Sequence, residues 1–339
     1  MTSSSAVQSH SSVPAGHAWR RAFTDLPREH GFEPMRVEGT LPAELQGTLY
    51  RNGPSNFSAQ GRPYGHWFDG DGAVSAVRLL GGRAEGAVKL VQSTALLAER
   101  AAGRALSVGY GTVAPGGLLQ RLRAPVKNSA NTSVIVWQDR LFALMEAGLP
   151  TELDPRDLST KGETNLEGAV IQSFSAHPHR IAERKTSYNF GVRLNGPPKL
   201  DIYALPDDGK ARRMVTIPLS GTTMIHDFAV TNRHLVFFAP PLRMNIPKVL
   251  LGLSSVGDSY TFKADEGTDI IVVPIDAPKD FIRFKAESFF QWHFANAFER
   301  GDEIVVDAVT SPDFASNTFL KQLPSRVPDQ GYAGTLTRN

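Results

Sequence analysis

The sequence predicts an all-β fold of the sandwich, barrel or propeller kind. From about Thr48 almost to the end of the chain, short runs rich in β-branched and aromatic residues alternate with Gly, Pro, Asn and Asp clusters. Many short strands at near-even spacing are typical of these folds. Helical periodicity is weak, and residues 117–123 are the best candidate for a short amphipathic helix. Since no exact internal repeat is visible, the choice of a propeller depends on the histidines described below.

The individual strands and hairpins follow from local patterns. The clearest strands are residues 74–79, 133–137, 141–145, 200–205, 214–219, 234–238, 270–275 and 303–309. Three pairs of runs predict hairpins, with turns at Gln138-Asp139, at residues 206–209 and at Asn232-Arg233.

Composition indicates a globular chain and excludes several kinds of site. The 339 residues are 41% hydrophobic, and 36 Lys and Arg against 34 Asp and Glu give a formal net charge of +2. The cations are scattered, so no nucleic-acid partner is expected. Without cysteine there is no disulfide, thiolate metal ligand or cysteine nucleophile, and a metal site must use His, Asp or Glu. The expected localisation is cytoplasmic.

The chain divides into a tail and one domain. Residues 1–20 are expected to be a disordered N-terminal tail. Its Ser-rich sequence lacks the charged start and apolar core of a secretory signal. Residues 21–339 are expected to form one β domain. No run reaches the ~18 apolar residues needed to span a bilayer, so any membrane contact is expected to be peripheral.

Three of the nine histidines share a context that suggests a metal site. His177, His226 and His293 each lie in an apolar, aromatic-flanked run, and they are separated by 49 and 67 residues. The first separation is close to the roughly 40–50 residues of common propeller blades, and the second leaves room for an insertion. Equivalent strands of successive blades would direct all three imidazoles towards a central axis, where they can bind Zn, Cu, Fe or Ni. The alternative, that each is a hydrogen-bonded core histidine, stays open at this point.

Five motifs spread over residues 41–299 resemble the carotenoid cleavage oxygenase family. The motifs are LPAELQGTLYRNGP (41–54), GHWFDGDG (65–72), SAHP (175–178), HDFA (226–229) and HFANAFE (293–299). Any one of them is weak, but all five in this order are highly specific.

The resemblance implies a seven-bladed β-propeller, with roughly five blades represented in this chain, and Fe(II) held on the axis by four histidines. Three of these ligands are assigned to His177, His226 and His293. The segment around Glu146 resembles the family's first motif for a carboxylate that orients a ligand imidazole. Thr132 occupies the position where the family places a threonine near the open coordination sites.

The resemblance also implies an Fe(II)-dependent dioxygenase. Such an enzyme uses O₂ to cleave a conjugated C=C bond of an apocarotenoid into two carbonyl products, while the protein supplies orientation and a dry tunnel. Stilbene-cleaving members carry a lysine directly before the orienting glutamate, where this chain has Met145. An apolar residue there favours a polyene, and stilbene cleavage is the alternative.

Polyenes dissolve in membranes, so a membrane surface is an expected peripheral partner. Residues 116–123 and 247–251 combine apolar and cationic side chains in a way that suits interfacial contact. The alternative is that both segments simply cover the propeller.

The family pattern stops early in this chain. The sequence has no histidine after His293, whereas the family places its fourth ligand near the end in a His-Gly context. The oxygenase domain over residues 21–339 is therefore expected to be incomplete at its C-terminus, as a fragment or a truncated product. An inert truncated propeller that acts only as a binding module, and a complete three-histidine site of another geometry, are the alternatives.

Two further features are interpreted as structural. The segment Asp69-Gly70-Asp71-Gly72 suggests a calcium loop of a propeller lactonase, but it lacks the closing Glu of an EF-hand and is interpreted as a hairpin turn. His66, His179 and His234 lack the context of the other three histidines and are interpreted as turn or surface residues.

Overall fold

A computed structural model describes residues 20–325 and 334–338, so only Arg20 of the expected N-terminal tail lies among the described residues. The described chain consists mainly of strands, and the pairings between its named strands are antiparallel. The all-β class expected from the sequence is confirmed.

Five larger sheets follow one another along the described chain. Sheet one is β1(His30–Pro34), β6(Arg83–Leu90), β5(Asp71–Leu80) and β2(Gly47–Asn56), and sheet two is β10(Thr160–Glu163), β9(Thr151–Leu153), β8(Arg140–Leu144) and β7(Ser133–Trp137). Sheet three is β11(His179–Ile181), β12(Thr186–Arg193), β13(Lys199–Pro206) and β14(Arg212–Pro218). Sheet four is β15(Ala229–Val230), β16(His234–Ala239), β19(Thr268–Pro274) and β20(Ile282–Ala286), and sheet five is β21(Phe290–Arg300), β22(Glu303–Ser311) and β23(Thr335–Arg338).

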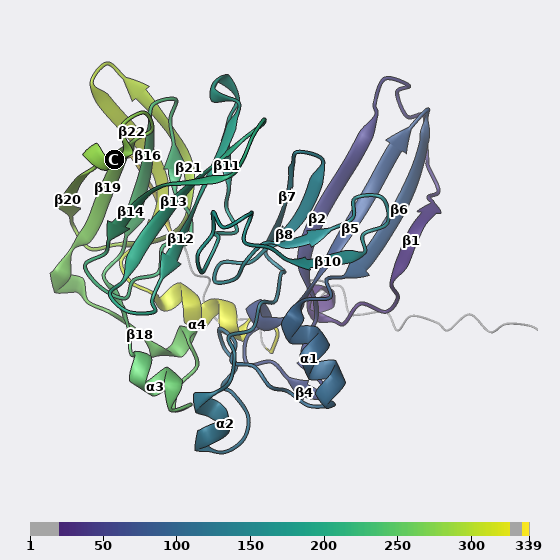
Figure 1. Cartoon of the computed structure of the whole chain (residues 1–339), viewed down its shortest axis with the longest axis horizontal. Helices are drawn as coiled ribbons and strands as arrows, with labels where there is room; N and C mark the ends of the chain where they lie inside the picture. The colour runs from purple at the N-terminus through teal and green to yellow at the C-terminus, as the bar shows by residue number, and fades with distance from the viewer. Residues whose placement is uncertain (1–19, 326–333, 339) are drawn as a thin grey trace, which may run out of the picture.

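The smaller elements connect these sheets. Two short ribbons pair β3(Ser58–Ala59) with β4(Arg62–Pro63) and β17(Leu242–Met244) with β18(Tyr260–Phe262). The helices are α1(Thr94–Ala102), α2(Leu118–Leu122), α3(Ile246–Leu250) and α4(Ala315–Gln322), and they gather at one end of the sheets (Figure 1). Single 3₁₀ turns are η2(Trp67–Asp69), η3(Ala182–Arg184), η4(Gly257–Ser259), η5(Ala264–Glu266) and η6(Pro278–Asp280).

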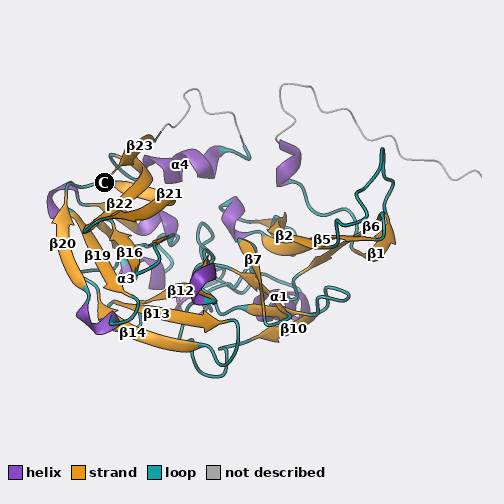
Figure 2. Cartoon of the chain, turned by 90° about the horizontal axis from the view of Figure 1, so that it is seen from above, coloured by secondary structure: helices purple, strands orange, loops and turns teal. Residues whose placement is uncertain are grey.

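Figure 2 shows the sheets arranged in an arc. Apolar clusters fill the spaces between neighbouring sheets. One cluster lies between sheets one and two, a second between two and three, and a third, the largest, between three and four. A fourth cluster joins sheets four and five. This face-to-face packing holds each sheet against the next and directs one edge strand of each sheet inwards. These inner strands are β2, β7, β11, β15 and β21, and contacts join β2 to β7, β11 to β15 and β15 to β21.

The expected strands and hairpins form with small shifts at their ends. The two-residue turn between β7 and β8 places Gln138 and Asp139 at φ values of 50° and 59°. Two positive values are what a tight hairpin of right-handed twist requires. The five larger sheets agree with a propeller, while the number of blades and the closure of a ring stay a prediction.

Candidate metal centre

Three histidine side chains converge at the inner strands of sheets three, four and five. Nε2 of His226 lies 3.0 Å from Nε2 of His177 and 3.2 Å from Nε2 of His293. The potential ligand atoms of all three residues lie within 4.8 Å of one another. His226 is buried, His177 is half-buried and His293 is exposed. The three residues that share a sequence context are therefore together in space, and they can hold a metal ion.

The inner strands explain how these residues come together. His177 lies two residues before β11, and His226 lies three residues before β15. His293 lies within β21, where the register against β22 shifts between Gln291 and Phe294. Such a bulge bends the strand and changes the direction of the side chains beside it. Each histidine is thus carried by a different sheet but directed to one point.

The spacing and charge of the imidazoles fit a bound cation. Two ligands at right angles, each about 2.1 Å from one ion, lie about 3.0 Å apart, which is close to the two shorter separations. Burial and the neighbouring His226 imidazole lower the pKa of His177 to about 4, and the same causes lower the pKa of His293. Both rings are therefore neutral at pH 7, with lone pairs free for a metal. Neutral imidazoles suit Zn, Cu, Fe and Ni alike.

Glu146 contacts one of these histidines, as the sequence motif suggested. His226 Nδ1 donates a hydrogen bond of 2.8 Å to Glu146 Oε2. Burial alone would lower the pKa of His226, but the charge and the hydrogen bond of Glu146 raise it. A proton held on Nδ1 leaves the lone pair on Nε2, the atom that faces His177 and His293. Within residues 20–325 and 334–338, Nδ1 of these other two imidazoles has no hydrogen-bond partner.

Thr132 lies at the start of an inner strand, directly before β7. Its side chain is exposed, and its Oγ1 donates a hydrogen bond of 3.0 Å to Asn131 Oδ1. The next residue, Ser133, donates from its hydroxyl to the carbonyl of Ala176, the residue before His177. The Thr132 segment is therefore attached to the His177 segment, and the role of Thr132 near an open coordination position stays a prediction.

Two residues beside this cluster, Asp227 and Trp292, were not predicted from the sequence. His179 Nε2 donates to Asp227 Oδ1 at 2.9 Å, and Asp227 directly follows His226. The ring of Trp292 lies perpendicular to the His226 ring, with 5.0 Å between their centroids. Asp227 lies within the motif HDFA, and Trp292 directly precedes the motif HFANAFE. Their partners are 48 or more residues away in the sequence, so no local pattern identifies these contacts.

The interpretation of the other histidines needs correction. His66 is 3% exposed and lies at the start of η2, where its Nδ1 accepts a hydrogen bond from the backbone of Phe68. His179 belongs to strand β11, and His234 begins β16 with its Nδ1 3.0 Å from Glu299 Oε1. His66 is therefore a turn residue, as expected, although it is buried, whereas His179 and His234 are strand residues with carboxylate partners.

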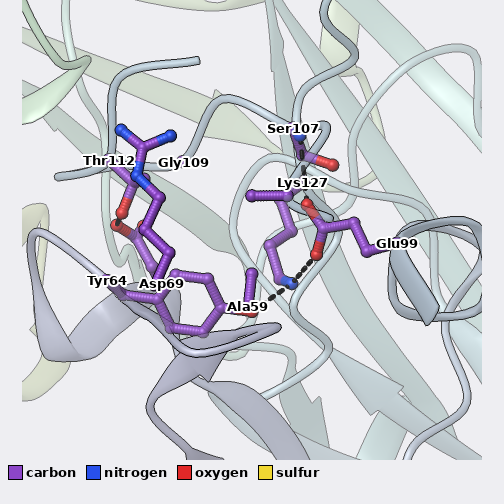
Figure 3. Close-up of a pocket in the computed structure, with 10 residues that line it drawn as sticks. Ala59, Tyr64, Asp69, Glu99, Ser107, Gly109, Thr112 and Lys127 are labelled. Atoms are coloured by element: carbon purple, nitrogen blue, oxygen red, sulfur yellow. Dashed lines mark hydrogen bonds and ion pairs between the residues drawn. The ribbon is translucent and has the colours of Figure 1, made fainter. Parts of the chain in front are cut away.

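The interpretation of residues 69–72 as a hairpin turn is also wrong. Asp69 ends η2 and Asp71 begins β5. Lys127 Nζ lies 2.9 Å from Glu99 Oε2 (Figure 3). It also lies 2.7 Å from Asp71 Oδ1, and all three side chains are at most 3% exposed. Asp69 Oδ2 accepts a 2.6 Å hydrogen bond from Thr112. Because a lysine and a hydroxyl already occupy these carboxylates, the arrangement does not support a calcium loop.

The two segments expected to meet a membrane lie side by side. Arg121 Nη1, in α2, donates a 3.3 Å hydrogen bond to the carbonyl of Gly252, just after α3. Leu118, Leu119 and Leu250 are 56%, 70% and 52% exposed. We call the exposed surface of residues 116–123 and 247–253 the α2–α3 patch. None of the described helices has the length and apolar character needed to cross a membrane.

Comparison with known proteins identifies relatives over most of the chain. Residues 23–338 match the family described as retinal pigment epithelial membrane protein. The apocarotenoid-15,15′-oxygenase of Synechocystis sp. is 34% identical over 91% of this chain and 67% of that protein. A resveratrol cleavage oxygenase of Aspergillus fumigatus is 30% identical over 85% of this chain and 59% of that protein.

Solved structures show the same similarity. The crystal structure of cobalt-substituted Synechocystis apocarotenoid oxygenase has a TM-score of 0.79 and 34% identity, and covers 87% of this chain. The matched region is 64% of that chain. The present chain thus spans about three fifths to two thirds of the length of these relatives.

Proposed function

This chain belongs to the retinal pigment epithelial membrane protein family, which includes the carotenoid cleavage oxygenases, and from that premise we propose that it is an Fe(II)-dependent dioxygenase. The proposed reaction is cleavage of a conjugated C=C bond of an apocarotenoid with O₂ to give two aldehydes. The convergence of the Nε2 atoms of His177, His226 and His293 is the observation that carries the proposal. Since the chain spans 67% of the apocarotenoid-15,15′-oxygenase, activity of the whole enzyme is part of the proposal.

The residues of this chain would have distinct roles in that reaction. His177, His226 and His293 would hold the ion through Nε2, and ferrous iron, when bound, supplies the redox chemistry with O₂. Glu146 keeps the proton of His226 on Nδ1 and fixes the direction of the ring. Thr132 is proposed to border the open side of the ion, where its hydroxyl and small size leave room for the reactants.

The residue before Glu146 supports the choice of substrate. Met145 is half-buried and cannot donate the hydrogen bond that a lysine would offer to a phenol. A thioether is apolar and adaptable, so this position suits a polyene chain. Cleavage of a hydroxystilbene is the second candidate, because a resveratrol cleavage oxygenase is among the relatives.

Metal loading followed by product analysis tests the proposal. The purified full chain is loaded anaerobically with Fe(II), its iron content is measured, and it is given an apocarotenal or a hydroxystilbene with O₂. We expect bound iron and aldehydes from the apocarotenal. His226→Ala is expected to lose the iron, and His234→Ala, which alters a histidine outside the cluster, is expected to keep it.

Each contrary result has a separate meaning. Aldehydes from the hydroxystilbene alone would overturn the substrate. Iron binding without any product would favour an inert binding module. Absence of iron from the unaltered chain would overturn the metal site.

We further propose that the α2–α3 patch meets a membrane surface. Its exposed leucines lie beside Arg121 and Lys248, an arrangement that suits an apolar interior bordered by anionic headgroups. In flotation with anionic liposomes, Leu119→Ser is expected to bind less than the unaltered chain. Leu80→Ser, at a 62% exposed leucine in sheet one, is the matched control. A chain that stays wholly in the soluble fraction would refute the contact.

A further inference from the structure

Asp227 is a buried carboxylate outside the histidine cluster, and it accepts hydrogen bonds from three groups that lie close in sequence to the three histidines. The residue is 3% exposed. Its Oδ1 accepts from His179 Nε2 at 2.9 Å and from the amide of Phe228 at 2.8 Å. Its Oδ2 accepts from the amide of Phe294 at 3.1 Å. Both oxygens are thus directed at groups of the protein.

The three donors come from the three segments that carry the histidines. His179 lies two residues after His177, and Phe228 lies two residues after His226. Phe294 directly follows His293. One carboxylate therefore connects the inner strands β11, β15 and β21, which belong to three different sheets.

The Phe294 amide is available because of the local shape of β21. This strand pairs with β22 on one side only in the described chain, and its register shifts on both sides of Phe294. Asp227 accepts this amide hydrogen bond next to His293, where the bulge sets the direction of the imidazole. A change at Asp227 would therefore be transmitted to His293 through a single peptide unit.

His179 holds the other oxygen of the carboxylate. Its ring meets the ring of Phe228 edge-on, with 4.8 Å between the centroids, so the imidazole has both an apolar and a polar contact. With Nε2–H donating to Asp227, the orientation of the carboxylate is defined by contacts on both oxygens.

We propose that Asp227, supported by His179, is a positioning residue that sets the separation of the His226 and His293 imidazoles and thereby the affinity for the metal. This inference rests on the proposed function. Asp227 would act through the backbone of β21, without touching the ion or a ligand ring. A merely structural role, in which Asp227 stabilises the packing of the sheets but not the metal centre, is the competing explanation.

The test compares two variants with a matched control. Asp227→Asn keeps the size of the side chain but replaces one accepting oxygen with an NH₂ group, so that at least one of the three hydrogen bonds is lost. His179→Phe keeps an aromatic ring against Phe228 and removes the donor. Glu299→Gln is the control. Glu299 lies in β21, six residues after His293, and accepts hydrogen bonds from Thr231 and His234 of the sheet-four segment. It therefore also connects sheet four to β21, but away from the histidine cluster.

The first measurement needs no metal. Amide hydrogen exchange of the metal-free chain is followed at Phe294, where we expect exchange about tenfold faster in Asp227→Asn and no comparable change in the control. His179→Phe is expected to speed amide exchange at Phe294 by a smaller factor. If Asp227→Asn does not fold, the result for His179→Phe decides the test. Unchanged exchange at Phe294 in a folded variant would overturn the inference.

The second measurement is Co(II) affinity in competition with a chelator, together with the visible spectrum of the bound ion. We expect about tenfold weaker binding and an altered spectrum for the Asp227 and His179 variants, with the control unchanged even if all variants lose similar thermal stability. Equal affinity in all four proteins would overturn the inference. An unaltered chain that binds no Co(II) would instead overturn the proposed function, and exchange at Phe294 would still decide whether Asp227 holds the His293 segment.

Discussion

Replacing Glu146 should weaken metal binding by an amount that the structure allows us to estimate. His226 Nδ1 donates to this carboxylate at 2.8 Å, and a hydrogen bond to a charged group contributes about 1.5–3 kcal/mol. The Glu146 side chain is 29% exposed, so partial screening by solvent favours the lower part, about 1.5–2 kcal/mol. Since about 1.4 kcal/mol corresponds to a factor of ten in affinity, Glu146→Ala should lower the affinity for the metal roughly 10–30-fold. Glu146→Gln keeps a neutral hydrogen-bond acceptor for His226 and should lower the affinity for the metal only about fivefold.

The assay is titration of the metal-free chain with Co(II) in competition with a chelator. Glu152→Gln is the control, because Glu152 lies in β9, the strand that follows the turn containing Glu146, and pairs with Arg140 and not with a histidine. The expected order of affinity is unaltered chain and control first, then the Gln variant, then the Ala variant. Affinities within about twofold of one another for all four proteins would refute the reasoning, as would equal losses in the control.

Three further predictions concern stability. Burial would raise the pKa of Glu299, but hydrogen bonds from three side chains hold it at about 2, below the ordinary value of 4.5. The contribution of ionised Glu299 to the free energy of unfolding should be present above about pH 4.5 and lost as the pH falls towards 2. The acid unfolding curve of Glu299→Gln should lack this loss, and identical curves for the variant and the unaltered chain would contradict the prediction. Lys127→Met leaves two buried carboxylates without their cation and should lower the free energy of unfolding, measured in urea, by about 3–5 kcal/mol. An added Glu99→Gln should restore part of this loss. A loss below about 1 kcal/mol would show that the cation is dispensable. Phe237→Ala, at a fully buried ring between sheets three and four, should cost about 3–5 kcal/mol, whereas Leu80→Ala at an exposed position should stay within about 0.5 kcal/mol, and similar losses for both would contradict the assigned core.

Some features of this protein follow from residues that are close in the sequence. Apolar runs of strand length and the turn at Gln138-Asp139 predict their own conformations, because backbone preferences and side-chain alternation act over a few residues. The histidines could be selected in the same way, since His177, His226 and His293 each lie in a similar local context. The all-β class and the candidate ligand set were therefore accessible from the sequence.

Tertiary structure decided which of the polar groups meet. Glu146 reaches His226 across 80 residues, and Asp227 bonds to Phe294 across 67, because neighbouring sheets bring their inner strands together. Arg121 likewise joins two surface segments that are 131 residues apart. A buried donor or acceptor must find a partner, but packing selects that partner from any part of the chain. The sequence by itself determined the strands and the histidines, while the folded arrangement of the sheets alone determined the contacts that orient them.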